Sequence, residues 1–273
     1  MLVLSSYISS DSPDPSILSA RGMHQATVAQ LANLARIETH VEKAHPTLGS
    51  AVKVGEKDEE AFEILGLLVG VLNETGEVLE RLGKQSLGVW LLEKLIEAEG
   101  DGDKLVHELA SIFPAFRDVH LVDDQPVFIL KKALWLVTVV SLAFRTREPS
   151  EVPFEVPDIS GFPVFADNVL PTLLVHHSIL DLSSSPDPAL RSLSLTDLPS
   201  LSLSTASATR LRAASIVACS DIVQRAHELA TQPGKEWLAS WTEQGLDGWL
   251  WCEGKRGEMK DVERIAEKGT VYY

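Results

Sequence analysis

The chain has 273 residues, of which 45% are hydrophobic, and a formal net charge of −15. This length and hydrophobic content predict a folded protein, most economically one domain with a small lobe at one end, and exclude a disordered chain. The charge argues against a nucleic acid as the substrate, because 24 Lys and Arg against 39 Asp and Glu leave few cations for a basic stripe. A mononucleotide needs only one or two local cations, which this chain can supply.

The sequence carries no targeting or membrane signal. The longest apolar run, residues 133–144, is too short to cross a bilayer, and residues 1–8 lack the basic leader and cleavage site of a signal peptide. Cys219 and Cys252 lack the spacing of a disulfide framework and are expected to be reduced thiols. We therefore expect a cytoplasmic protein, with the nucleus as a second compartment, and no membrane partner.

Apolar residues recur at helical spacing along most of the chain, which predicts an all-α fold. In chain order, helices are expected at residues 27–37, 60–82, 87–99, 104–113, 127–145, 168–180 and 209–231, with short helices near 235–242 and 259–267. Strand signals are sparse. Residues 193–203 alternate like a half-buried strand, but Pro199 and the surrounding serines favour a long Ser- and Leu-rich loop over 183–205.

Asp167 stands where an apolar stretch, FPVFADNVLPTLL at 162–174, turns into a predicted helix. Asp and Asn are favoured N-caps, so Asp167 or Asn168 fits the start of a helix whose first turn contains Pro171. An apolar environment also disfavours an ionised carboxylate, so an acid there is either a cap or a chemical group. The residues leave both interpretations open.

Lys131 and Lys132 interrupt the apolar helix predicted at 127–145. Consecutive helical positions point about 100° apart, so the two ammonium groups are not expected to share one environment. Either lysine could extend to the surface, and either could bind a phosphate as a point charge. We favour Lys131 as the phosphate ligand, with Arg117 as a second available cation.

The remaining polar and aromatic candidates each have a structural and a functional interpretation. Asp247 is a turn or cap residue before another helix, or a polar contact for a base. Arg117 and Asp118 are predicted to form a local ion pair or cap. His176 and His177 diverge on a helix, so neither a metal site nor a cofactor is expected. The aromatic residues that are either core or stacking surfaces are Phe165, Trp249 and Trp251.

Four blocks of the sequence carry a family resemblance. They are LNETGEVL at 72–79, FPAFRD at 113–118 with VFILKKALW at 127–135, the Asp167 block at 162–174, and LDGWLW at 246–251. In these blocks the chain resembles the helical enzymes that salvage queuosine by hydrolysing the N-glycosidic bond of queuosine 5'-monophosphate and freeing queuine. It is most similar to their fungal branch, and the likeness runs from about residue 5 to residue 273. It implies an all-α fold related in shape to the helical DNA glycosylases.

The resemblance also implies site roles. Asp167 matches the acid of the family, which would stabilise an oxocarbenium-like sugar and orient a water molecule. A lysine matches at Lys131. The residues then expected to contact the nucleotide substrate are Lys131, Phe165, Asn168, Asp247, Trp249 and Trp251.

The family normally has a helical segment before residues 7–10 that supplies aromatic residues to the base pocket, so the chain is expected to be N-terminally truncated. We expect one queuosine-salvage hydrolase-like domain over 1–273. The alternative is a non-catalytic or degenerate member that has lost part of the base pocket. A glycosylase acting on DNA or tRNA is disfavoured by the acidity of the chain.

Overall fold

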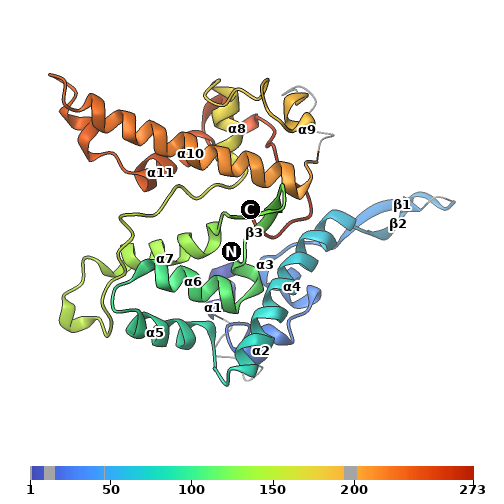
Figure 1. The fold of residues 1–273 in the computed structure, drawn as a ribbon. Coiled ribbons are helices and arrows are strands. Elements are labelled where there is room, and N and C mark those ends of the chain that lie inside the picture. The colour runs from blue at the N-terminus through green and yellow to red at the C-terminus, as the bar shows by residue number, and fades with distance from the viewer. Residues whose placement is uncertain (1, 9–15, 46, 194–201) are drawn as a thin grey trace. The chain divides into compact units, whose positions relative to one another are not determined.

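The computed structural model describes residues 2–8, 16–45, 47–193 and 202–273, and helices dominate them (Figure 1). The α-helices are α1 (Leu2–Ile8), α2 (Ala20–His24), α3 (Val28–Ala35), α4 (Glu59–Arg81), α5 (Leu87–Ala98), α6 (Gly102–Ile112), α7 (Lys131–Phe144), α8 (Val169–His176), α9 (Pro188–Arg191), α10 (Thr205–Leu229) and α11 (Glu243–Glu253). The 3-10 turns are η2 (Pro114–Phe116), η3 (Pro149–Glu151), η5 (Glu236–Ser240) and η6 (Gly257–Asp261). The predicted mostly helical fold is confirmed. Among these described helices, none is long and apolar enough to cross a membrane.

Most predicted helices are present with shifted ends, and two predictions were wrong in part. The stretch predicted as helix at 127–145 begins with a strand, and α7 starts only at Lys131, because Leu130 adopts a left-handed conformation with φ 52° that breaks the helix. The helix predicted near 259–267 is the 3-10 turn η6 followed by irregular chain. The loop predicted at 183–205 contains the short helix α9, and residues 194–201 lie outside the described part of the chain.

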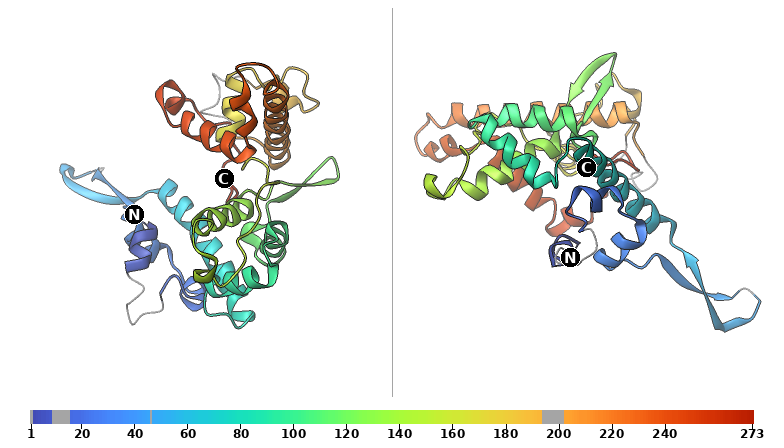
Figure 2. Two further views of the ribbon diagram at one scale, coloured as in Figure 1. Left: turned by 90° about the vertical axis from the view of Figure 1, so that its left-hand side faces the viewer. Right: turned by 90° about the horizontal axis from the view of Figure 1, so that it is seen from below.

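Two antiparallel hairpins were missed by the helical pattern. β1 (His40–His45) pairs with β2 (Gly49–Lys57), and β3 (Val119–Val122) pairs with β4 (Gln125–Phe128). The β3–β4 turn consists of Asp123 and Asp124, which both adopt positive φ, as tight hairpin turns require. The β1–β2 hairpin projects beyond α4 (Figure 2), and its valines are therefore largely exposed.

Contacts divide the chain into two compact units, Met1–Glu97 with Ser111–Ala115, and Ala98–Ala110 with Phe116–Tyr273. In the first unit, α4 buries Leu65 and Leu79 on one face and lies very close to α2. Gly76 permits this approach, because a Cβ there would lie 2.2 Å from the backbone nitrogen of His24. Asn73 Nδ2 donates to the carbonyl oxygens of the chain at the end of α2, the nearest at 2.8 Å. The LNETGEVL block is therefore a helix-packing element of this unit.

The second unit has its core where α8, α10 and α11 meet. The buried residues are Val164, Val169, Leu170, Leu173, Leu174, Cys219, Val223, Leu246 and Leu250. Gly254, at the end of α11, admits α8, since a Cβ there would lie 2.6 Å from Val169 Cγ1. This core fixes the start of α8 beside one face of α11, and the pocket described next lies there. The interpretation of residues 1–273 as one domain stays a prediction.

Candidate functional site

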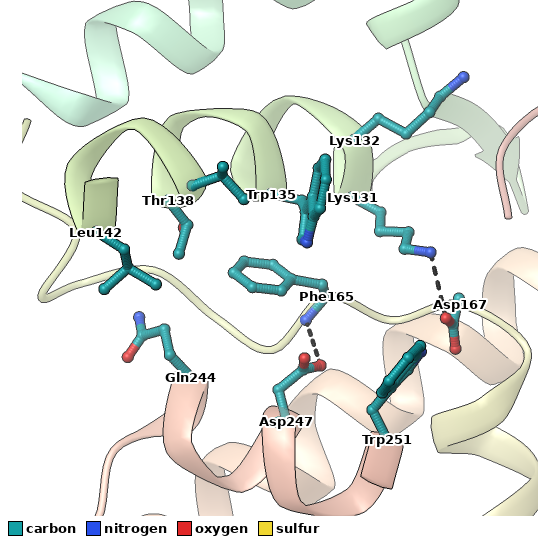
Figure 3. Close-up of a pocket in the computed structure, with 12 residues that line it drawn as sticks. Lys131, Lys132, Trp135, Thr138, Leu142, Phe165, Asp167, Gln244, Asp247 and Trp251 are labelled. Carbon is teal, nitrogen blue, oxygen red and sulfur yellow. Dashed lines mark hydrogen bonds and ion pairs between the residues drawn. The ribbon is translucent and has the colours of Figure 1, made fainter. Parts of the chain in front are cut away.

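A pocket of about 570 Å³ lies in the second unit between α7, α11 and the segment that leads into α8 (Figure 3). Its size suits a small organic ligand. The lining residues are Lys131, Lys132, Trp135, Thr138, Val139, Leu142, Phe165, Asp167, Gln244, Asp247, Gly248 and Trp251. Two helices thus face each other across it, with Phe165 and Asp167 presented by the extended chain between them.

Asp167 is both a cap and a pocket residue. Its side chain is buried, with 6% of the residue exposed, and Oδ1 accepts a hydrogen bond from the Val169 backbone nitrogen at 2.6 Å. Asn168 precedes the first residue of α8, yet its side chain makes no capping bond. The other oxygen of Asp167, Oδ2, lies 3.2 Å from Lys131 Nζ, as Figure 3 shows. The capping bond therefore fixes one carboxylate oxygen and leaves the other facing the pocket.

The two lysines begin α7 and make different contacts. Lys131 Nζ bonds Asp167, whereas Lys132 Nζ donates to the carbonyl oxygen of Val271 at 2.8 Å. Burial lowers the pKa of Lys132 and the charge of Lys131 acts in the same direction, while Asp118 opposes them. Because both side chains are half-buried and bonded, neither fits the interpretation of a lysine that simply reaches solvent.

Asp247 is an interior residue of α11, so its interpretation as a turn or cap before a helix was wrong. Its Oδ1 accepts from the Phe165 backbone nitrogen at 3.0 Å. Burial raises the pKa of Asp247 to about 6; the charge of Asp167 adds to this rise, and the Phe165 bond and Lys131 counteract it. The pocket therefore holds two carboxylates in different environments, one bonded to an ammonium group and one bonded to a backbone nitrogen.

The aromatic candidates are only partly brought together. Phe165 and Trp251 line the pocket, and Figure 3 shows Phe165 between the two helices. Trp249 is 57% exposed and lines a separate hollow with Trp241 and Thr242. Neither Trp249 nor Asn168 is among the residues that line the pocket, so substrate contacts for these two remain predictions without support from its geometry.

Several pocket residues were missed, although helical spacing carried a signal for them. Lys131, Trp135, Thr138 and Leu142 follow one stripe of α7, and Gln244, Asp247, Gly248 and Trp251 follow one stripe of α11. Gln244 Nε2 donates to the carbonyl oxygens of Ile159 and Phe162 at 2.9 and 2.6 Å. The sequence alone does not identify the pocket-facing side of α7 or α11; it can be inferred from helical spacing only once one residue on that side is known to face the pocket.

Asp118 and Arg212 form a buried ion pair, and Arg212 also bonds the backbone next to the pocket residue Asp167. Arg117 and Asp118 were predicted to form a local ion pair or cap. The ion-pair alternative was wrong, because the Asp118 carboxylate binds the guanidinium of Arg212 through two bonds of 3.0 and 2.6 Å. Arg117 Nε instead donates to the Ala110 carbonyl oxygen at 3.0 Å. A partner 94 positions away along the chain cannot be read from local spacing.

Metal-binding side chains do not gather in the described residues, where no group of three or more His, Cys, Asp or Glu could hold a metal ion. The rings of His176 and His177 contact each other edge to face at the end of α8. Cys219 is buried in the core, and burial raises the pKa of its thiol to about 12. The lining of the pocket itself supplies carboxylates, ammonium groups and aromatic surfaces.

The pocket combines a fixed acid, adjacent cations and aromatic walls, which is a suitable environment for a charged, planar small molecule. Comparison with protein families gives a match over residues 13–273 to the family described as queuosine salvage protein. No curated protein matches the chain.

Proposed function

Because this chain belongs to the queuosine salvage protein family, its role is in queuosine salvage, and we propose that it hydrolyses the N-glycosidic bond of queuosine 5'-monophosphate to release queuine. The observation that carries the proposal is the pairing of buried Asp167 with Lys131 in a pocket large enough for a nucleotide. An acid held in a fixed position on the wall of the pocket can approach one face of the sugar.

Asp167 is the catalytic residue in this proposal. Cleavage of a ribosyl bond builds positive charge on the sugar, and a fixed carboxylate stabilises that charge more than it stabilises the neutral ground state. Oδ1 is held by the Val169 nitrogen, so the carboxylate does not need to reorient during the reaction. Oδ2 faces the pocket and can also orient the attacking water.

The base lies between the aromatic side chains of α7, α11 and the intervening segment. Queuine is a 7-deazaguanine, so it carries carbon where guanine has a basic imidazole nitrogen, and protonation there cannot assist its departure. In the overall hydrolysis the departing base takes up the proton that the attacking water loses, and hydrogen bonds to its pyrimidine edge orient it. Asp247 can accept from the ring N–H and the exocyclic amine of that edge, while Phe165 and Trp251 cover the faces of the base.

The 5'-phosphate lies at the start of α7. Lys131 supplies the charge, and the first N–H groups of an α-helix have no intrahelical acceptors and favour an anion. Lys132 is a second cation at the same helix end. A single phosphate needs no more than this, in keeping with the overall acidity of the chain.

The test is to incubate the purified protein with queuosine 5'-monophosphate and to detect free queuine by mass spectrometry. We expect release by the wild type and a loss of at least about a hundredfold in Asp167→Asn. Asn keeps an oxygen for the Val169 nitrogen, so circular dichroism and melting should change little. Turnover by Asp167→Asn near the wild-type rate would remove Asp167 from the mechanism, and no release by the wild type would overturn the proposed reaction.

A further inference from the structure

Arg212 connects the interior of the second unit to the residue before Asp167. It lies on α10 with 3% of its surface exposed, and its Nε donates to the Ala166 carbonyl oxygen at 2.8 Å. Its two terminal nitrogens bind the Asp118 carboxylate, which is 1% exposed. The guanidinium is planar and rigid, so these contacts hold the Ala166 peptide at a fixed place relative to Asp118.

Asp118 also contacts, through its backbone carbonyl, the chain that leads into α7 and Lys131. Its carbonyl oxygen accepts from the nitrogens of Ile129 and Leu130 at 3.0 and 3.3 Å, immediately before α7 begins. Leu130 has the left-handed conformation that turns the chain into α7 and so directs Lys131. Asp118 therefore holds the backbone just before Lys131 through its own carbonyl oxygen, and it holds the backbone just before Asp167 through Arg212.

We propose that Arg212, held by Asp118, is a positioning residue that sets the contact between Lys131 and Asp167. The kinetic part of this proposal rests on the proposed hydrolysis. Lys131 and Asp167 are 36 positions apart and belong to different elements, so their 3.2 Å separation requires a link between the chain before α7 and the chain before α8. The Asp118–Arg212 pair supplies this link, because it bonds Leu130, directly before Lys131, and Ala166, directly before Asp167.

Side chains with rings surround the buried pair. His120 Nε2 lies 3.2 Å from Asp118 Oδ1, and the ring of Tyr272 contacts His120 edge to face. The ring of Tyr273 lies 5.3 Å from the Arg212 guanidinium carbon. A buried ion pair is a weak source of stability compared with apolar packing, whereas the two parallel bonds of this pair orient Arg212 relative to Asp118. A geometric role in the adjacent site accounts for its presence beside the pocket.

The test compares Arg212→Lys with Arg210→Lys on the same helix. Lysine keeps the charge opposite Asp118 but cannot bond Asp118 twice and Ala166 at once. Arg210 also binds a carboxylate, Asp123, at 2.9 Å, and it does not line the pocket, so it is the matched control. In crystal structures we expect the separation of Lys131 Nζ and Asp167 Oδ2 to increase by about 1 Å in Arg212→Lys only, and an unchanged separation overturns the proposal.

Kinetics supply a second readout. We expect kcat to fall about ten- to a hundredfold in Arg212→Lys with KM within about threefold of wild type, and Arg210→Lys to match wild type. In an Asp167→Glu background, where the carboxylate is already displaced, Arg212→Lys should cost much less. An equal cost in both backgrounds indicates general destabilisation and contradicts positioning. If the wild type releases no queuine, the proposed hydrolysis fails, and the crystallographic distance alone decides the role of Arg212.

Discussion

The two pocket carboxylates show how environment separates residues of one chemical type. Asp167 has a capping bond and an ammonium partner, whereas Asp247 has one backbone donor and is desolvated by the walls of the pocket. Desolvation penalises the ionised form, which is why the pKa of Asp247 rises to about 6. The acid with a cation is suited to stabilising positive charge, and the desolvated acid is suited to strong hydrogen bonds with a ligand.

The raised pKa makes a prediction about stability. An unfolded Asp titrates near about pH 4, so folded Asp247 retains its proton between about pH 4 and 6, and this contribution to stability is lost as the pH rises through 6. Asp247→Asn cannot ionise and keeps an oxygen for the Phe165 nitrogen. Relative to wild type, its free energy of unfolding should rise by roughly 1 to 3 kcal/mol between pH 4 and pH 7. Urea unfolding at several pH values measures this difference, and a constant difference would contradict the burial of this charge.

At the residue scale, the sequence was sufficient where a side chain acts through its own neighbourhood. Asp167 was singled out by its place where an apolar stretch becomes a helix and by the family resemblance, and it both caps α8 and lines the pocket. Arg212 was not found, since nothing near it in the sequence indicates that its partners are Asp118 and Ala166. Long-range bonds of this kind depend on the complete fold.

Among the elements, α7 carries the prediction about phosphate recognition. We expect Lys131→Ala to reduce kcat/KM for queuosine 5'-monophosphate about tenfold more than for the unphosphorylated nucleoside, because only the nucleotide offers an anion for a charge-assisted bond. Both substrates should also lose some rate, since Lys131 contacts Asp167. Steady-state kinetics with the two substrates measure the ratio.

Lys132→Ala is the matched variant, one position along the same helix. Its ammonium group already donates to Val271, so we expect it to affect the two substrates more equally. If the preference for the nucleotide over the nucleoside disappears in Lys132→Ala and survives in Lys131→Ala, then Lys132 and not Lys131 binds the phosphate. Equal losses on both substrates in Lys131→Ala would indicate a role confined to Asp167.

Helix α4 offers a test of packing within the first unit. Gly76→Ala places a Cβ 2.2 Å from the His24 nitrogen and 2.6 Å from the Ala20 oxygen, so α2 must move, and we expect a loss of about 1 to 3 kcal/mol. Gly70 lies on the same helix with nothing within 4 Å of an added Cβ, and Gly70→Ala should stabilise by about 0.5 to 1 kcal/mol. Chemical denaturation of both variants measures the contrast. Equal effects would show that α2 and α4 are not held this close.

At the element scale, periodicity located helices better than it located their ends. Helix α4 spans residues 59–81, against a prediction of 60–82, because its apolar face is long and regular. The β1–β2 hairpin was not predicted because its described side chains are largely exposed, so the sequence shows no alternation of buried and exposed residues there. The strands β3 and β4 have only four residues each, which is too short for a clear pattern. The start of α7 was displaced for a different reason, since the left-handed turn at Leu130 accompanies bonds that the Ile129 and Leu130 nitrogens donate to the Asp118 carbonyl oxygen.

For the whole molecule, composition predicted a folded protein and constrained its partners, while the spacing of apolar residues predicted the helical fold. Division into two compact units was not predicted, because helical spacing continues through both and no composition shift marks the crossing segments. The family blocks fall in both units, with LNETGEVL in the first and LDGWLW in the second. Assignment of the chain to queuosine salvage therefore depends on the match over residues 13–273 and not on the pocket alone.

The net charge of −15 leads to the last prediction, which concerns tRNA. A protein that binds tRNA through several phosphates releases counterions, so its affinity falls steeply as salt rises. The pocket needs cations only for one phosphate, and the excess of 15 negative charges repels a polyanion at distances up to the Debye length, about 10 Å in 0.1 M salt. In fluorescence anisotropy we expect no saturable binding of labelled tRNA below about 10 µM protein at that salt, while turnover of queuosine 5'-monophosphate changes less than about threefold between 0.05 and 0.2 M salt. Saturable tRNA binding with a steep dependence on salt would show that a nucleic acid, and not its released nucleotide, is the partner of this protein.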